Sequence, residues 1–298
     1  MNATRQFKSM SLLILAQIMV GVNIVFSKVL LISMPILFIL TIRFTLAAVV
    51  LLPLHWLTLD RKTPIKVHFK KLSRRDWRFI IAQALTAGIF FNVLMLLGLN
   101  HTDANVAGII TSALPALIAF LSWAVLREKM TVKKMICVIF ATVGLTIIAC
   151  DKFQGIASTH SFFGDSIVLL SLLPEAAYYI LCKCHMSSLP IFLISSLLNG
   201  INALLMIIFL INSQTPNPSV PWSQMLILIL LGLSSGLFYV FWAKGAEHVD
   251  GMLSSLSTAV MPVATVVLAW LILGEQLSIG QSLGMGMVIF SILLYARP

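Results

Sequence analysis

Long apolar runs dominate the chain, and short polar segments separate them. A helix rises about 1.5 Å per residue, so roughly 20 apolar residues cross the ~30 Å hydrocarbon core of a bilayer. The runs reach this length and predict an all-α integral membrane protein with ten transmembrane helices. The predicted spans are approximately 10–32, 34–57, 78–99, 104–126, 132–150, 164–184, 190–212, 222–243, 251–273 and 278–296.

Six landmark residues recur after a constant interval. Each of them, in the segment 101–128, has an identical residue 147 positions later. The first set is His101, Asp103, Thr111, Pro115, Trp123 and Glu128; the second is His248, Asp250, Thr258, Pro262, Trp270 and Glu275. Self-similarity at a fixed interval indicates internal duplication. We therefore expect two five-helix repeats, 1–150 and 151–298, with any site lying between them.

Basic residues are concentrated on one side of the predicted membrane. With a cytoplasmic N-terminus, most of the 20 lysines and arginines fall inside, many of them in a basic loop at about 58–77. This bias predicts a multi-pass protein of the cytoplasmic (inner) membrane with both termini in the cytoplasm. The loop reads first as a topology signal, and a contact with anionic lipid is an alternative. Because five is odd, the second repeat is inverted, which places a site near the midplane and permits alternating access.

Composition agrees with a membrane protein. Hydrophobic residues form 59% of the chain and charged residues 10%, and the mean hydropathy is +1.02, all unlike a soluble domain. The net charge of +10 is explained by the one-sided loops, so we expect no nucleic acid partner. The four cysteines lack a matching second ligand pair, so we expect no metal, and nothing requires a cofactor or an obligatory protein partner. ATP-driven transport is not expected, because no phosphate-binding loop motif is present.

Polar side chains inside the apolar runs are the candidate site residues, since such groups face a partner helix or a water-filled cavity. The first run contains Gln17, Asn23, Ser27 and Lys28. Asn23 either bonds a neighbouring helix or contacts substrate, and Lys28 either snorkels toward the outer surface or binds. Arg43, deep in the second run, either clamps backbone carbonyls or recognises an anionic substrate group.

Glu175 is the only acidic residue deep inside a predicted span, roughly 15 Å from the outer end of the sixth. Such a carboxyl is a candidate proton carrier or a partner for a substrate amine. The alternative is an internal pair with Arg43 or Lys28. Tyr178 and Tyr179 follow within one turn, so Tyr179 shares the face of Glu175.

Aromatic residues of the eighth run, Tyr239 and Trp242, would complete an aromatic wall with Tyr178 and Tyr179, although core packing explains them equally well. In the repeat register Asn92 matches Tyr239, which makes Asn92 a further substrate-binding candidate.

Two prolines and two polar features complete the inventory. Pro115 and Pro262 are expected to kink the fourth and ninth helices, either beside a pathway or for packing. Asp103 is placed to cap the fourth helix. A polar stripe in the seventh run either bonds a neighbouring helix or lines a cavity; it consists of Ser195, Asn199 and Asn202.

Several segments resemble the EamA-type transporters of the drug/metabolite transporter superfamily. The strongest is 256–281, with T-A-V-M-P and A-W-L-I-L-G-E-Q-L-S, and the first copy contains T-S-A-L-P and W-A-V-L-R-E-K-M-T. The segments N-I-V-F-S-K at 23–28 and I-R-F-T-L-A-A around Arg43 are also similar. One departure is Arg127, where the second copy has Gly274 before its glutamate.

The resemblance implies a carrier of small metabolites, often amino acids and often outward, with the fifth and tenth helices peripheral. We therefore expect a secondary transporter that exports a small polar or zwitterionic metabolite, best an amino acid or related compound, with proton coupling through Glu175. Uptake or exchange of a nucleotide-like or nucleoside-like metabolite is the alternative. An intramembrane enzyme or a structural membrane protein is disfavoured, because no paired catalytic constellation and no soluble partner domain is evident.

Overall fold

The computed structural model describes residues 3–58, 63–127, 161–185, 187–213, 220–246 and 260–296, together with isolated positions between these ranges. All regular structure in these residues is helical, as predicted. The predicted fifth span lies almost wholly outside the described residues, as does the beginning of the ninth. The landmarks Glu128, His248 and Asp250 also lie outside them.

Seven helical segments of the described chain are long and apolar enough to cross a membrane, and they correspond to the first four predicted spans and to the sixth, seventh and eighth. They are α1 (Ala3–Leu31), α2 (Ile36–His55), α4–η2–α5 (Arg74–Leu99), α6–α7 (Ala104–Leu126), α9 (Phe162–Cys184), α10 (Ile191–Asn212) and α11 (Trp222–Ala246). The described part of the chain is therefore all-helical, and the protein is a multi-pass membrane protein.

The described chain contains four further helical elements. The shorter apolar segment formed by α13 (Val260–Leu268) and η4 (Ala269–Leu273) falls in the ninth predicted span, and α14 (Ile279–Ala296) falls in the tenth. The basic loop contains a short helix that the apolar pattern did not predict, α3 (Ile65–Lys70).

The third span is not a uniform α-helix. Between α4 (Arg74–Gln83) and α5 (Phe91–Leu99) the backbone widens into the π-helix η2 (Ala84–Phe90). Asn92 Nδ2 donates hydrogen bonds to the carbonyls of Ala87 and Gly88, at 2.9 and 2.6 Å. The amide of Asn92 thus supports a segment where the regular helical ladder is interrupted, and such π segments often occur at functional sites.

The predicted kink in the fourth span is a break between two helices. α6 (Ala104–Thr111) ends before Ser112, and α7 (Leu114–Leu126) begins with Pro115 in its first turn. A proline is well tolerated there, because the first amides of a helix have no partner within the helix.

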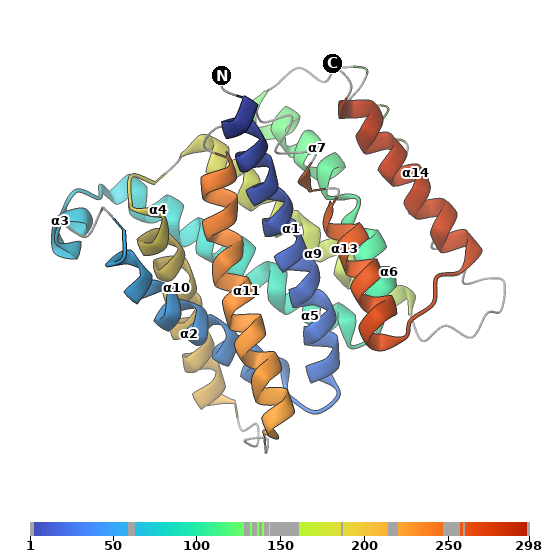
Figure 1. Cartoon of the computed structure of the whole chain (residues 1–298), viewed down its shortest axis with the longest axis horizontal. Helices are drawn as coiled ribbons and strands as arrows, with labels where there is room; N and C mark the ends of the chain where they lie inside the picture. Colours follow the sequence, from blue (N-terminus) through green and yellow to red (C-terminus); the bar gives the residue numbers. More distant parts are fainter. Residues whose placement is uncertain are drawn as a thin grey trace.

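The most extensive helix packing joins the two predicted repeats. α2 packs along α10, and α1 packs against α11 and α13, whereas α1 and α2 touch each other little. α9 in turn packs against α5, η2 and α7. Figure 1 shows α1 beside α11 and α13 in the middle of the bundle. Helices of one predicted repeat therefore pack mainly against helices of the other.

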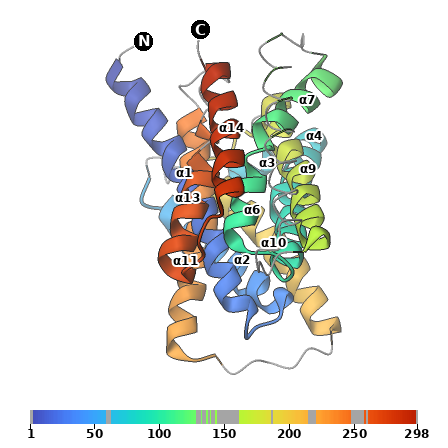
Figure 2. The ribbon, with the colours of Figure 1, turned by 90° about the vertical axis from the view of Figure 1, so that its right-hand side faces the viewer.

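The beginning of α1 and the end of α14 lie at the same end of the bundle (Figure 1, Figure 2). We call this the terminal end, and the opposite end the distal end. At the terminal end, His185 Nε2 and Asp76 Oδ1 are 2.5 Å apart and join α9 to α4. α14 stands at the edge of the bundle in Figure 1, and its contacts with other described helices are mainly with α6.

The two helical segments that carry the repeated tryptophans end in the same way. Arg127 after α7 has φ 53°, and Gly274 after η4 has φ 69°; these are the two positive φ values in the described residues. Glycine adopts this left-handed conformation freely, whereas a side chain there costs roughly 1–2 kcal/mol. The sequence departure at Arg127 therefore leaves the repeated backbone geometry intact at an energetic cost.

Candidate functional site

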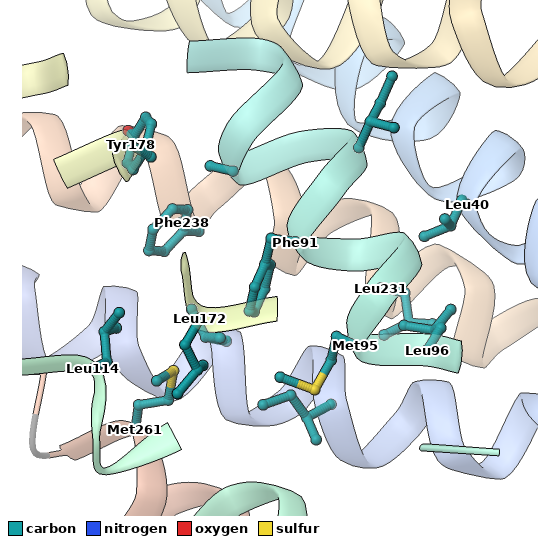
Figure 3. Packing of buried hydrophobic residues seen from close by; sticks show 14 of the residues in the cluster. Leu40, Phe91, Met95, Leu96, Leu114, Leu172, Tyr178, Leu231, Phe238 and Met261 are labelled. Carbon is teal, nitrogen blue, oxygen red and sulfur yellow. The ribbon is translucent and has the colours of Figure 1, made fainter. Parts of the chain in front are cut away.

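Aromatic side chains of α9 and α11 form a single cluster in the bundle interior, which we call the aromatic cluster. The cluster consists of Tyr178, Tyr179, Phe238, Tyr239 and Trp242, and all five are buried. Tyr178 meets Tyr239 edge to face with ring centroids 5.9 Å apart, and Tyr179 meets Trp242 at 4.7 Å. Figure 3 shows Tyr178 and Phe238 reaching toward each other from their two helices. Edge-to-face geometry fixes the rings against one another.

Glu175 lies one turn before Tyr179 on α9 and is 2% exposed. The Tyr179 hydroxyl hydrogen-bonds to the Glu175 carboxyl and also accepts from Gln17 Nε2 at 3.4 Å. Among the described residues no lysine, arginine or histidine forms an ion pair with Glu175. The internal pair with Arg43 or Lys28 that the sequence allowed is therefore not formed.

Arg43 is the largest fully buried side chain of the described chain, with 1% exposure. Its Nε and Nη1 atoms have no hydrogen-bond partner among these residues, so they clamp no carbonyl. The guanidinium carbon lies 4.9 Å from the ring centroid of Phe44. Tyr239 lies within electrostatic range of both Arg43 and Glu175. The structure thus brings a cation and a carboxyl to one aromatic cluster without pairing them.

The predicted residue Asn23 serves the packing of two helices. Its Nδ2 donates to Ser234 Oγ at 2.9 Å and to the Met19 carbonyl at 2.8 Å, and Ser235 Oγ donates to its Oδ1 at 3.0 Å. These bonds join α1 to α11. The contact between neighbouring helices that the sequence allowed for Asn23 is therefore present.

The polar stripe of α10 is buried and poorly satisfied. Ser195, Asn199 and Asn202 are each 0% exposed. Neither amide atom of Asn202 has a partner in the described residues, and neither does Asn199 Oδ1. A Cβ at Gly88 would fall 1.8 Å from Asn202 Nδ2, so only glycine lets η2 approach this amide. Of the two readings of the stripe, hydrogen bonding to a neighbouring helix is not seen for Asn202.

The proline-bearing segments meet across the repeats. Pro262 is buried in the first turn of α13, while Pro115 opens α7 directly after α6. α6 packs closely on α13, since a Cβ at Gly108 would approach the Thr265 side chain to 2.8 Å.

Lys28 is bound at the distal end and belongs to a separate, well-satisfied polar group. Lys28 Nζ donates to the carbonyls of Leu99 and Thr102, at 2.6 and 2.8 Å. Thr102 Oγ1 donates in turn to Asp165 Oδ1 at 2.5 Å, which joins the α5–α6 connection to α9. Lys28 therefore holds backbone carbonyls rather than pointing free toward the membrane surface.

The cap of α6 differs from the prediction. Asp103 occupies the N-cap position but its side chain makes no capping hydrogen bond. The Glu275 carboxylate caps the helix instead: Oε1 accepts from the Ala104 amide at 3.0 Å and Oε2 from the Asn105 amide at 2.7 Å. A residue 171 positions away thus replaces the local cap, which sequence spacing could not reveal.

Comparison with known proteins identifies the family. The model of the EamA-like transporter family matches residues 7–150 and 162–297. The chain belongs to this family. The EamA-like family is a family of transporters, so its name agrees with a multi-pass bundle whose polar residues gather between the repeats.

Curated relatives of this EamA-like protein include several bacterial and archaeal transporters. Bacillus subtilis (strain 168) has an uncharacterized transporter, YetK, that is 29% identical over 284 residues, covering 92% of this chain and 82% of its own length. The uncharacterized transporter YoaV of the same strain is 24% identical and covers 72% of this chain and 75% of its own. A transporter of Archaeoglobus fulgidus is 23% identical, with coverage of 76% and 80%. A crystal structure of a protein at 17% identity has the same fold, with a TM-score of 0.67 and 96% of both chains covered.

The sequence pattern of this EamA-like chain does not single out three residues of the candidate site. Gln17 was noted as polar but not chosen, although it binds Tyr179. Phe238 joins the aromatic cluster directly before Tyr239. Asn202 was recognised within a stripe, and the signal that would have raised it is Gly88, a glycine inside an apolar span.

Proposed function

We propose that this EamA-like protein is a secondary transporter that exports a small zwitterionic metabolite, an amino acid or a related compound, by alternating access. One observation carries this proposal: Arg43 and Glu175 are buried near the same tyrosine, Tyr239, and neither is paired with an opposite charge of the described chain. An isolated buried charge is costly unless it gains a partner. A substrate carboxylate would supply that partner for Arg43, and a substrate amine would supply it for Glu175.

The aromatic cluster supports a substrate with an apolar part. Trp242 and Tyr179 pack edge to face beside Glu175, and their rings offer apolar area with polar tips. Pockets for small molecules are mostly apolar with a few placed polar groups, and this combination is present around Glu175. In the proposed site the rings surround the substrate body while the two charged groups orient its ends.

The proposed carrier has ten transmembrane helices in two inverted five-helix repeats, residues 1–150 and 151–298. The family match to two segments of similar length supports this division. The packing also supports it, since the contacts of α1 with α11 and α13 have counterparts in those of α9 with α5 and α7. In the proposed orientation the terminal end, with both termini, faces the cytoplasm and the distal end faces outward across the inner membrane. The one-sided distribution of basic residues supports this orientation.

Proton coupling through Glu175 is the proposed energy source. Its carboxyl is 2% exposed and hydrogen-bonded to Tyr179, and a buried carboxyl that lacks a cationic partner is suited to carry a proton. Substrate amine and proton would then compete for one carboxyl, which links their movements.

Reconstituted protein tests the proposal. Proteoliposomes are loaded with a panel of labelled amino acids and nucleosides, and efflux is followed with and without a proton gradient. We expect at least one zwitterion to leave chemically unchanged, faster than from protein-free liposomes. Recovery of a modified product would indicate an enzyme instead, and absence of flux for the whole panel would contradict the proposed substrate class.

A nucleoside-like substrate is the second candidate, favoured by the number of aromatic rings. The five aromatic side chains of the cluster come from α9 and α11 and lie in the bundle interior. Base–aromatic stacking suits such a surface. The two candidates differ at Arg43, because a nucleoside has no carboxylate for the guanidinium. Arg43→Gln should lower the transport efficiency for a zwitterion by on the order of 100-fold. Nucleoside flux should stay within about twofold of the parent, a change smaller than the tenfold that ~1.4 kcal/mol represents.

A further inference from the structure

The Glu275 carboxylate joins the two repeats at the distal end through backbone contacts. Both oxygens accept amide hydrogens from the first turn of α6, those of Ala104 and Asn105. The Asn105 side chain returns a hydrogen bond from Nδ2 to the Gln276 carbonyl at 3.2 Å. We call these three hydrogen bonds the distal clamp. Charge-assisted bonds at a helix N-terminus are among the stronger polar contacts, because the helix dipole adds to them.

The distal clamp lies where the repeats must separate for a pathway to open. Glu275 follows η4, and α13–η4 packs against both α1 and α6. α6 and α13 come from the two predicted repeats and pack closely at Gly108 and Thr265. With the clamp formed, the start of α6 is sealed, and the Ala104 side chain is 0% exposed.

We propose that Glu275 is a positioning residue of the transport cycle, whose carboxylate closes the distal end by holding the N-terminus of α6 and must release it before substrate leaves. This inference rests on the proposed alternating access. It assigns Glu275 a part in the motion and leaves substrate recognition to Arg43 and Glu175.

Two ionisable groups lie near the Glu275 carboxylate. Asp103 at the start of α6 and Lys28 of α1 are the ionisable neighbours of its carboxyl in the described chain. Burial raises the pKa of Glu275 above its ordinary value, although the Asn105 and Ala104 amides lower it in part.

A cysteine reporter measures opening without requiring transport. In purified protein, Ala104→Cys places a thiol under the clamp, and Asn100→Cys places one at an exposed position of the same end. Maleimide labelling of each introduced cysteine is read by site-resolved mass spectrometry, so the native cysteines stay in place. The ratio of the two labelling rates reports the fraction of molecules with an open distal end.

Removing the carboxylate should open the clamp. Glu275→Ala is expected to raise the labelling ratio by about tenfold or more, since two hydrogen bonds to a charged acceptor are lost. Gln276→Ala is the matched control, because Gln276 is exposed and contributes only its backbone carbonyl. The labelling ratio of Gln276→Ala should stay within about twofold of that of the parent, a smaller change than the tenfold that ~1.4 kcal/mol represents. An unchanged ratio in Glu275→Ala would overturn the proposal.

A second variant guards against misfolding and separates this proposal from the proposed function. Glu275→Gln keeps the size of the side chain but lacks the charge, so it should stay folded and raise the labelling ratio above that of the parent, by less than Glu275→Ala. A labelling ratio in Glu275→Gln equal to that of the parent also overturns the proposal, because the charge of the carboxylate would then not hold α6. If labelling behaves as expected but no substrate is moved, the clamp stands and the proposed function fails. If substrate is moved while Glu275→Ala labels like the parent, the clamp fails and the proposed function stands.

Discussion

Lys28 and Arg43 are both basic residues within apolar helices of the first repeat, yet their surroundings are opposite. Lys28 Nζ donates to two backbone carbonyls at the distal end. Arg43 is 1% exposed, and its Nε and Nη1 atoms have no acceptor in the described residues. A buried charge that the protein satisfies itself stabilises the fold, whereas one left unsatisfied is costly and is retained for another partner.

The carboxylates repeat this contrast. Glu275 accepts two amide hydrogens of α6, so its binding capacity is used between the repeats. Among the described residues, Glu175 bonds to Tyr179 of its own helix, and it lies beside the aromatic cluster. The charged groups of the distal end are therefore bonded within the protein. Those beside the aromatic cluster have no opposite charge among the described residues, and in our account they bind a ligand.

The largest effect on transport is expected at Arg43, and it tests this comparison most strongly. Arg43→Gln should lower the transport efficiency for a zwitterion by on the order of 100-fold, as when one partner of a buried charge pair is removed. The midpoint of thermal unfolding should stay unchanged or rise, because an unpaired buried charge is removed. Efflux from proteoliposomes and a melting curve of the same preparation measure both. A marked fall in the unfolding midpoint would show that Arg43 is structural.

Glu175→Gln should abolish the dependence of efflux on a proton gradient. The amide keeps the size and the hydrogen bond to Tyr179 but cannot ionise. Folding, followed by size-exclusion profile and melting, should be retained. Gradient-dependent efflux equal to that of the parent would remove Glu175 from the coupling step.

Lys28→Met should lower stability and leave substrate affinity nearly unchanged, the reverse of what is expected for Arg43→Gln. Two carbonyls, of Leu99 and Thr102, lose their donor, so we expect a loss of about 2 kcal/mol of stability. The apparent substrate affinity should change little, because Lys28 lies in the distal polar group. Ligand titration beside thermal unfolding distinguishes the two effects, and a selective loss of affinity would place Lys28 in the substrate site.

The smallest effect is expected at the two left-handed helix ends. Arg127→Gly should raise stability by up to about 1 kcal/mol, and Gly274→Ala should lower it by about the same amount, since only glycine adopts positive φ freely. Neither residue is among the charged groups of the distal end and the aromatic cluster that are compared above. Transport rates that shift with either variant, at unchanged stability, would show that the turns take part in the cycle.

Much of the fold follows from the sequence. Membrane spans need long apolar runs because backbone groups must be satisfied within lipid, and this constraint made α1, α2 and α9–α11 readable. The π-helix η2 was not readable, because its energy depends on Asn92 and on close packing by Asn202. Breaks of this kind are set by tertiary contacts rather than by local pattern.

The candidate site was partly predictable for a related reason. A lone ionisable residue in an apolar run stands out, so Arg43 and Glu175 were found and helical spacing added Tyr179. Spacing along the sequence does not show which of the buried charged groups has a hydrogen-bond partner within the protein. The ligation of Lys28 by the α5–α6 connection and the cap from Glu275 both join residues far apart in sequence.

The most direct test of the account is ligand-induced thermal stabilisation of the purified protein. The amino acid that is moved best is compared with its amide, which lacks the carboxylate, and with its N-acetyl derivative, which lacks the amine charge. We expect stabilisation by the amino acid alone, its loss in Arg43→Gln, and its retention in Lys28→Met. Equal stabilisation by the amide, or a full shift in Arg43→Gln, would contradict the claim that Arg43 is kept unpaired to bind the substrate carboxylate.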